Sequence, residues 1–183
     1  MTASFTGVLR IAALVLLTVV LEIAVVTQIT IFGANVDLLV LVTLSVGLLG
    51  GPIAGAVVGF SIGLVADMAL VQTLGVTSLL LTGVGYLGGR YRELRDATHK
   101  LVPVLGGFVA ALCFSACFAV IQFLLGVDST VSWLVARDAL VGAILTALFA
   151  PPVFAVVRWV LRPDLIEEMR PRRRPITNLR LSP

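Results

Sequence analysis

The stretch Gly47-Leu-Leu-Gly-Gly51-Pro52-Ile-Ala-Gly55-Ala-Val-Val-Gly59-Phe-Ser-Ile-Gly63-Leu-Val-Ala-Asp67 decides the fold class of this 183-residue chain. Within it, glycines recur every four residues and end in an aspartate, which places them on one face of a helix. The stretch lies inside a longer one, residues 11–89, that contains no Lys, Arg or His. A glycine-lined helix in such surroundings is typical of a protein embedded in a lipid bilayer.

Composition supports a membrane protein over a soluble one. Apolar residues make up 59% of the chain, charged residues 13%, and the mean hydropathy is +1.11. A soluble domain usually carries about 25% charged residues. Because backbone groups in hydrocarbon must be satisfied within their own segment, a spanning helix needs about 20 mostly apolar residues. We therefore expect an all-α integral membrane protein.

Turn and charge signals divide the chain into six apolar segments and a tail. The second segment is short and ends at Gly50-Gly51-Pro52, so five crossings remain possible if it joins the third as one broken element. Residues 162–183 are rich in Pro and Arg, which predicts a disordered basic tail outside a transmembrane bundle of residues 1–161. The predicted helices cover residues 9–31, 38–49, 53–71, 76–89, 101–125 and 133–161.

The distribution of positive charge predicts the orientation of this six-helix bundle. Of the 13 Lys and Arg residues, all but Arg137 fall on one side of a six-crossing chain. Cytoplasmic loops carry the excess of Lys and Arg, so we expect both termini in the cytoplasm. The apolar run after Arg10 is long and lacks a clean small-x-small cleavage site, which favours a retained first helix over a signal peptide.

Residues suited to catalysis or metal binding are scarce in the apolar segments. Cys113 and Cys117 lie one helical turn apart, but the single histidine, His99, precedes that helix. A metal site would need further ligands nearby, so the cysteines are interpreted as packing residues. Phosphate-cradling glycine motifs and aspartate clusters for Mg²⁺ are absent from the sequence. We expect no catalytic residue, no cofactor, no metal and no enzyme activity.

The spacing of glycines is a stronger indication of function than the few residues suited to catalysis or metal binding. Helices in lipid associate through small residues that let backbones approach closely. Two interpretations remain open, packing within the bundle and an interface with another molecule. The candidate positions for either are Gly51, Pro52, Gly55, Gly59, Gly63, Gly85 and Gly89.

Acidic and basic side chains at the membrane give further candidates. An ionised carboxylate in the bilayer centre costs about 2.5–3.5 kcal/mol, so Glu22 and Asp67 should contact a ligand, a neighbouring helix or the headgroup region. The tail arginines are expected to contact anionic lipids, and nucleic-acid binding is not expected. The outer turns offer Asp37, Gln72 and Asp128, and the tail offers Arg170, Arg172, Arg173 and Arg174.

The order of these motifs resembles the rod shape-determining protein MreD family. The matching features are Asn35-Val-Asp37-Leu-Leu, Gly51-Pro52, the Gly55, Gly59 and Asp67 face, Gly75, Gly85-Tyr86 and a proline-rich break at Ala150-Pro151-Pro152. Asn35 stands where the family often has proline, and Gly50 where it often has a basic residue. The resemblance covers most of residues 9–161.

This resemblance implies a non-enzymatic subunit of the bacterial cell-elongation complex, in the cytoplasmic membrane. Its implied partner is the bitopic protein MreC, with MreB, RodA and a transpeptidase in the same complex. The implied fold is similar to that of the substrate-binding subunits of energy-coupling-factor vitamin transporters, and such a transporter subunit is the alternative function. As a mechanism, small-residue packing would hold the partner's transmembrane helix, and the outer turns would meet its extracytoplasmic base.

Overall fold

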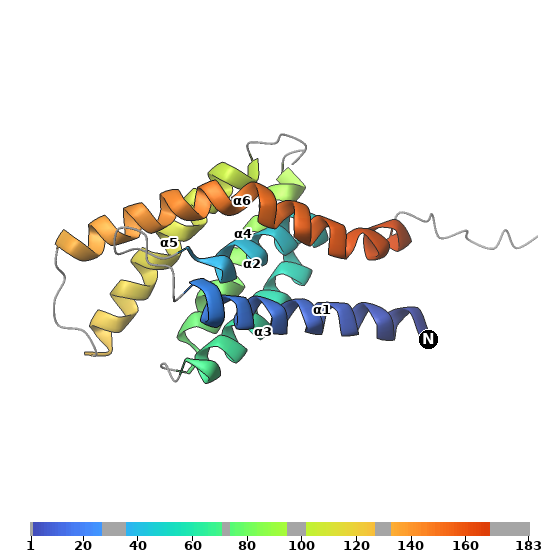
Figure 1. Ribbon diagram of the computed structural model, residues 1–183, viewed down its shortest axis with the longest axis horizontal. Coiled ribbons are helices and arrows are strands. Elements are labelled where there is room, and N and C mark those ends of the chain that lie inside the picture. The colour runs from blue at the N-terminus through green and yellow to red at the C-terminus, as the bar shows by residue number, and fades with distance from the viewer. Residues whose placement is uncertain (1, 27–35, 71–73, 95–101, 127–132, 169–183) are drawn as a thin grey trace, which may run out of the picture.

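The structure, a computed structural model, describes residues 2–26, 36–70, 74–94, 102–126 and 133–168. All the secondary structure in this part of the chain is helical (Figure 1). The helices are α1 (Thr2–Leu21), which continues into the short π-helix η1 (Glu22–Val26), α2 (Leu38–Gly50), α3 (Pro52–Ala69), α4 (Val76–Leu94), α5 (Val102–Leu124) and α6 (Trp133–Glu168).

These helices fall where the six apolar segments were predicted, which confirms the all-α prediction. Three ends extend well beyond the prediction. Helix α1 begins at Thr2 rather than at residue 9, α4 continues beyond Gly89 to Leu94, and α6 runs to Glu168, into the segment expected to be a disordered tail. The expected break at Pro151-Pro152 is wrong, because α6 is one helix through both prolines. Each proline removes one backbone hydrogen bond, and neighbouring residues in an apolar helix can hold the turn around it.

Helix α2 is the centre of the bundle. It contacts each of the other five α-helices, and its residues are buried without interruption from Leu39 to Leu48. A helix that is apolar on every side is expected to be enclosed by others. Its 13 residues extend about 20 Å, less than the roughly 30 Å of a hydrocarbon core.

A tight turn at Gly51 connects α2 to α3. Gly51 has φ of 90° and ψ of 178°, a conformation essentially restricted to glycine. Its amide donates to the Gly47 carbonyl oxygen at 2.9 Å, and Pro52 then occupies the first position of α3. Proline is suited to that position, because the first helical amides have no partner within the helix. The predicted Gly-Pro stop is thus the point where the chain reverses.

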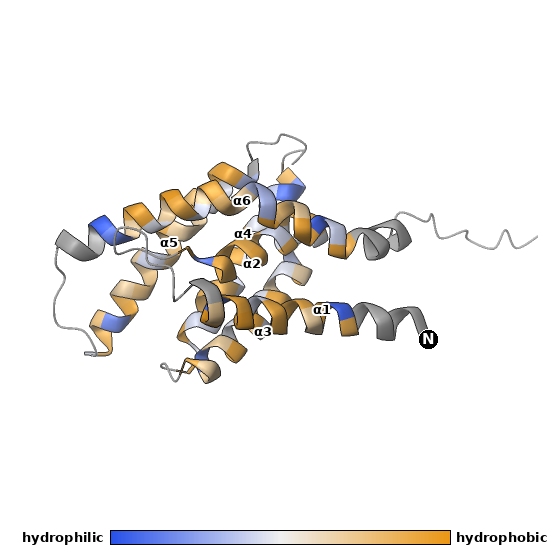
Figure 2. Cartoon of the chain, viewed as in Figure 1, coloured by the Kyte–Doolittle hydropathy of each residue, from blue (hydrophilic) through white to orange (hydrophobic). Residues whose placement is uncertain are grey.

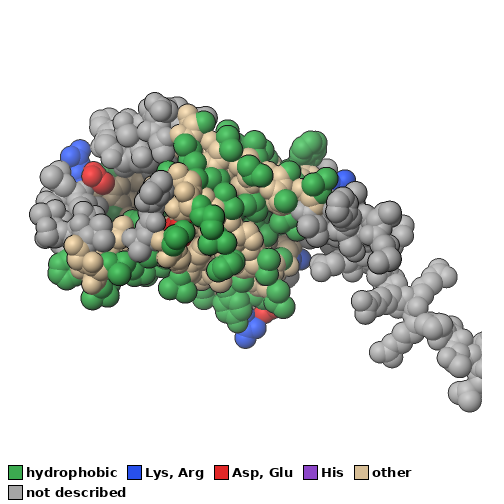
Figure 3. Space-filling view, turned by 90° about the horizontal axis from the view of Figure 1, so that it is seen from below, with side chains coloured by type: hydrophobic (Ala, Val, Ile, Leu, Met, Phe, Trp, Pro, Cys, Tyr) green, Lys and Arg blue, Asp and Glu red, His purple; other side chains and the backbone are tan. Residues whose placement is uncertain are grey.

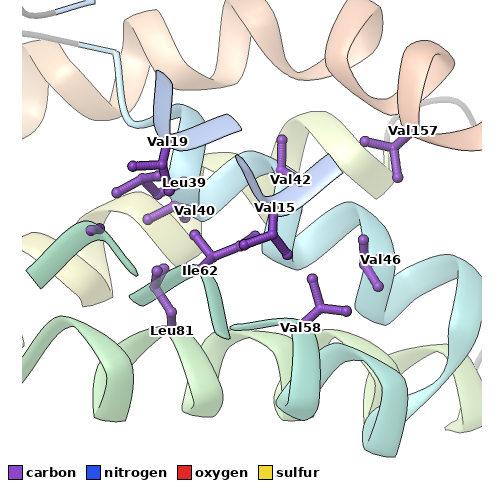
Figure 4. Close-up of a cluster of buried hydrophobic side chains, with 11 residues drawn as sticks. Val15, Val19, Leu39, Val40, Val42, Val46, Val58, Ile62, Leu81 and Val157 are labelled. Atoms are coloured by element: carbon purple, nitrogen blue, oxygen red, sulfur yellow. The ribbon is translucent and has the colours of Figure 1, made fainter. Parts of the chain in front are cut away.

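The apolar core joins five helices. It contains Val15 and Val19 of α1 together with side chains from α2, α3, α4 and α6. Figure 4 shows Val46 of α2 between Val58 of α3 and Val157 of α6. Burial of these residues ties the first and last helices to the central α2.

The outer surface of the bundle is apolar. Three helical segments of the described chain are long and apolar enough to cross a membrane, Pro52–Ala69, Pro103–Leu124 and Arg137–Leu161, and α2 is a shorter apolar helix. Hydrophobic residues run along the helices, and the face in Figure 3 carries its charged side chains mainly at the edges (Figures 2 and 3). Helix α1 begins and α6 ends at the same end of the bundle (Figure 1).

Candidate functional site

Helices α3 and α4 pack backbone against backbone along the predicted glycine face. A Cβ atom added to Gly55 would lie 2.8 Å from the carbonyl carbon of Gly85, and one added to Gly59 would lie 2.8 Å from that of Leu81. At Gly63 the same atom would lie 2.8 Å from the Thr77 carbonyl carbon. Each distance is well inside van der Waals contact, so no side chain fits between the two helices here.

Helix α2 enters the same contact through Gly47. A Cβ atom on Gly47 would overlap the carbonyl oxygen of Gly85, as would one on Gly55. Further along, a Cβ atom on Gly89 would overlap the backbone of Pro52. We call the contact formed by Gly47, Gly55, Gly59, Gly63, Gly85 and Gly89 the glycine seam. The seam is occupied by the chain's own backbone, so a partner's helix must find another surface.

Asp67 connects the end of α3 to the beginning of α4. Its side chain is 1% exposed, and its Oδ2 atom accepts hydrogen bonds from the amides of Gly75 at 2.8 Å and Ser78 at 3.5 Å. The first amides of a helix have no partner within the helix, and their partial positive charge attracts a nearby carboxylate. The Oδ1 atom is buried and has no hydrogen-bond partner among the described residues.

Glu22 has the equivalent role at the beginning of α2. Its Oε2 atom accepts a hydrogen bond of 3.1 Å from the amide of Leu38, the first residue of α2. The preceding amide, that of Asp37, donates to the Thr146 hydroxyl of α6 at 3.0 Å. Glu22 is 8% exposed and Thr146 is fully buried, so both bonds lie inside the bundle. The Asp37 side chain makes no capping bond to α2.

Glu22 and Asp67 therefore share one geometry. Glu22 lies just after α1 and binds the first amide of α2, and Asp67 lies in the last turn of α3 and binds amides at the beginning of α4. Thr146 completes this arrangement but was not a candidate, because a threonine in an apolar helix carries no signal of a partner 109 residues away.

Arginines cluster at the opposite ends of these helices. Arg92 of α4 donates to the carbonyl oxygen of Leu49, near the end of α2, where helical carbonyls lack partners within the helix. Arg90 pairs with Glu93 at 2.7 Å on the exposed face of α4. The remaining predicted candidates, Gln72, Asp128, Arg170, Arg172, Arg173 and Arg174, lie outside the described residues.

A comparison with protein families finds a match for this apolar helical chain. The model of the family described as rod shape-determining protein MreD matches residues 3–160. The chain belongs to the MreD family. No curated protein and no solved structure matches the chain.

Membership in the MreD family gives the chain a role in rod shape determination, and it confirms the resemblance seen in the sequence. The family is a structural, shape-determining component and is not a known enzyme family. The vitamin-transporter alternative gains no support from this match.

Helix α5 is the least buried of the three candidate membrane spans in the described part of this MreD-family protein. Only 11% of the α5 span is buried, against 39% for α3 and 33% for α6. Its exposed side contains three small residues in the middle of the helix, Cys113, Ala116 and Cys117. Leu105 and Val109 precede them and Val120 follows, all more than half exposed. This outer face of α5 is a small-residue surface that the bundle leaves uncovered.

Proposed function

We propose that this protein is a non-enzymatic scaffold of the bacterial cell-elongation complex and that it binds the single transmembrane helix of MreC. MreD-family membership supports the role in cell shape. The scarcity of residues suited to catalysis or metal binding in the apolar segments agrees with holding a partner rather than transforming a substrate. Other members of the complex, MreB, RodA and a transpeptidase, would be recruited directly or through MreC.

The outer face of α5 is the proposed docking surface. Association of helices in lipid depends on van der Waals packing, which is closest where small residues let two backbones approach. The glycine seam cannot be the docking surface for the partner's helix, because the chain's own α2 and α4 fill it. Cys113, Ala116 and Cys117 are the small residues that α5 presents outward. This exposed patch is the single observation on which the proposed docking site depends.

Enlarging Ala116 tests the proposed docking surface. We expect Ala116→Leu to reduce co-purification of full-length MreC with this protein by about tenfold, since forcing two packed helices apart costs on the order of 1–3 kcal/mol. Ala155→Leu is the matched control, because Ala155 is also exposed but lies on α6. Equal capture of MreC by both folded variants would rule out α5 as the docking face.

We also propose a multi-pass topology in the cytoplasmic membrane, with both termini in the cytoplasm. The beginning of α1 and the end of α6 lie at the same end of the bundle (Figure 1). The six-crossing topology would place every described arginine except Arg137 on the cytoplasmic side. Asp37, Gln72 and Asp128 would then belong to the outer turns. The arginines of the tail would contact anionic lipids of the inner leaflet.

Reporter fusions test this topology. A reporter that is active only in the cytoplasm should be active after residue 183, and one active only outside should be active within residues 127–132, between α5 and α6. The reason is the bias of Lys and Arg towards cytoplasmic loops. The reverse pattern at both positions would show that the bundle has the opposite orientation, with the basic residues outside.

A further inference from the structure

Helices α3 and α4 together expose an apolar surface. The partly exposed hydroxyl groups on them, those of Ser61 and Thr82, donate to carbonyl oxygens of their own helices, so neither needs water. Such a surface is suited to contact with hydrocarbon. We call its large apolar side chains, each more than half exposed, the α3–α4 face: Ile53, Val57, Phe60 and Met68 of α3, and Leu79 and Leu87 of α4.

Contacts at both ends of the helix pair fix the height of the α3–α4 face. At one end, Gly89 of α4 lies level with Pro52 at the beginning of α3, since a Cβ atom on Gly89 would overlap the Pro52 backbone. At the other end, the Asp67 carboxylate of α3 accepts a hydrogen bond of 2.8 Å from the Gly75 amide, just before α4. Because the helices are joined at both levels, they cannot slide past each other to lengthen the face.

The face between these two levels is shorter than a bilayer core. At the helical rise per residue, residues 52–67 of α3 extend about 22 Å and residues 76–89 of α4 about 20 Å. A tilted helix covers less height than its own length, so these lengths are upper limits for any orientation. The hydrocarbon core of a bilayer is about 30 Å thick. By the same rise, the apolar spans Pro103–Leu124 of α5 and Arg137–Leu161 of α6 are about 32 and 36 Å long.

Charged groups begin directly beyond Gly89, so the hydrocarbon cannot cover more of α4. Arg90 and Glu93 form an exposed ion pair with an N–O distance of 2.7 Å. Arg92, on the same turn, donates to the Leu49 carbonyl oxygen at the end of α2. Moving such groups into hydrocarbon is costly, whereas a bilayer deforms at a modest cost per ångström. The lipid therefore has to adapt to the protein here.

We propose that the α3–α4 face thins the bilayer beside it and favours phospholipids with short acyl chains as its neighbours, while α5 and α6 contact lipid of ordinary thickness. A spanning surface shorter than the hydrocarbon core is accommodated by local thinning of the bilayer. Tilting relieves only the opposite mismatch, in which a helix is too long. The proposal concerns the protein alone in lipid, so its failure would leave MreC binding untouched.

Quenching of tryptophan fluorescence by brominated phosphatidylcholines tests the proposal on the full chain. Phe60→Trp places a reporter near the middle of α3, and Phe149→Trp places a matched one near the middle of the α6 span, each in a Trp133→Phe, Trp159→Phe background. Phe60 and Phe149 are 52% and 45% exposed. At Phe60→Trp the dimyristoleoyl lipid should bind about threefold more tightly than the dioleoyl lipid, and at Phe149→Trp the order should be reversed.

A charge-removing variant tests the cause of the preference. Arg90→Leu combined with Glu93→Leu lengthens the apolar surface of α4 by about one turn, so the preference at Phe60→Trp should move to the dioleoyl lipid. Arg158→Leu removes an exposed charge from α6 and should leave that preference unchanged. If Phe60→Trp does not fold, Val57→Trp replaces it on the same face. The same order of chain lengths at the α3 and α6 reporters, or no change after Arg90→Leu with Glu93→Leu, would overturn the proposal.

Discussion

Gly85→Ala is expected to unfold the bundle, whereas Gly83→Ala is expected to leave it intact. A Cβ atom at Gly85 would overlap the carbonyl group of Gly55 and lie 3.1 Å from its Cα atom. The obstruction is backbone, which cannot rotate away as a side chain could. A Cβ atom at Gly83, two positions earlier in α4, would meet nothing within 4 Å.

The two substitutions make the same chemical change with opposite expected results. Alanine is favoured over glycine inside a helix by about 1 kcal/mol, so Gly83→Ala should be neutral or stabilising. Gly85→Ala should cost roughly 3 kcal/mol or more, because α3 and α4 must move apart to relieve the overlap. The unfolding midpoint in mild detergent, measured by fluorescence-detected gel filtration after heating, compares them directly. Equal midpoints would show that the glycine seam is not as close as described.

Asp67→Ala is the second substitution with a large expected effect. It removes the only described hydrogen-bond partner of the Gly75 amide and one from the Ser78 amide, at a site where the side chain is 1% exposed. A buried amide left without a partner costs about 1–3 kcal/mol. For the two amides together, we therefore expect Asp67→Ala to lower the free energy of unfolding by roughly 2–4 kcal/mol and to open the turn before α4.

Asp67→Asn separates the hydrogen bond from the charge. An asparagine carbonyl can still accept from Gly75, but it carries no negative charge beside the first amides of α4. If the hydrogen bonds dominate, Asp67→Asn should lose less than half as much stability as Asp67→Ala in the same heating assay. Protease cleavage between residues 70 and 76 should increase in Asp67→Ala only. Matched stability of Asp67→Ala and the unsubstituted protein would refute the capping role.

Much of the fold could be predicted from the sequence because its signals are local. Helix positions follow from apolar runs bounded by Gly, Pro and charged residues, and the α2 to α3 reversal follows from Gly51-Pro52. The four-residue glycine spacing also predicts a close helix contact. Gly47 could have been added to the candidates, since it continues the same spacing through Gly51 to Gly55.

The arrangement of the helices was not predictable in the same way. The sequence predicts a short second segment that could also join the third as one broken element, yet α2 is the central helix of the bundle. Other helices contact α2 on all sides. The periodicity of hydrophobic residues cannot show which helices surround an apolar segment. Glu22 and Asp67 were identified as costly residues that need a partner, but the amides they hold depend on the tertiary fold.

The glycine candidates were found by their spacing, but the sequence left open what they contact. Small residues favour close approach whether the neighbour is the same chain or another one. Only the positions of α2 and α4 show that the seam is filled from within. Cys113 and Cys117 were interpreted as packing residues because no further metal ligands lie near them in the sequence, and the sequence does not show that α5 presents them outward.

The central place of α2 also constrains how the protein is made. The ribosome synthesises α2 early. The Asp37 amide at the beginning of α2 donates to the hydroxyl of Thr146 in α6, which lies 109 residues later in the chain. Until the ribosome has completed α6, helix α2, which is shorter than the hydrocarbon core is thick, must remain with part of its surface uncovered. Assembly can therefore finish only near the end of translation, and a chain that stops within α6 would leave its core open to membrane quality-control proteases.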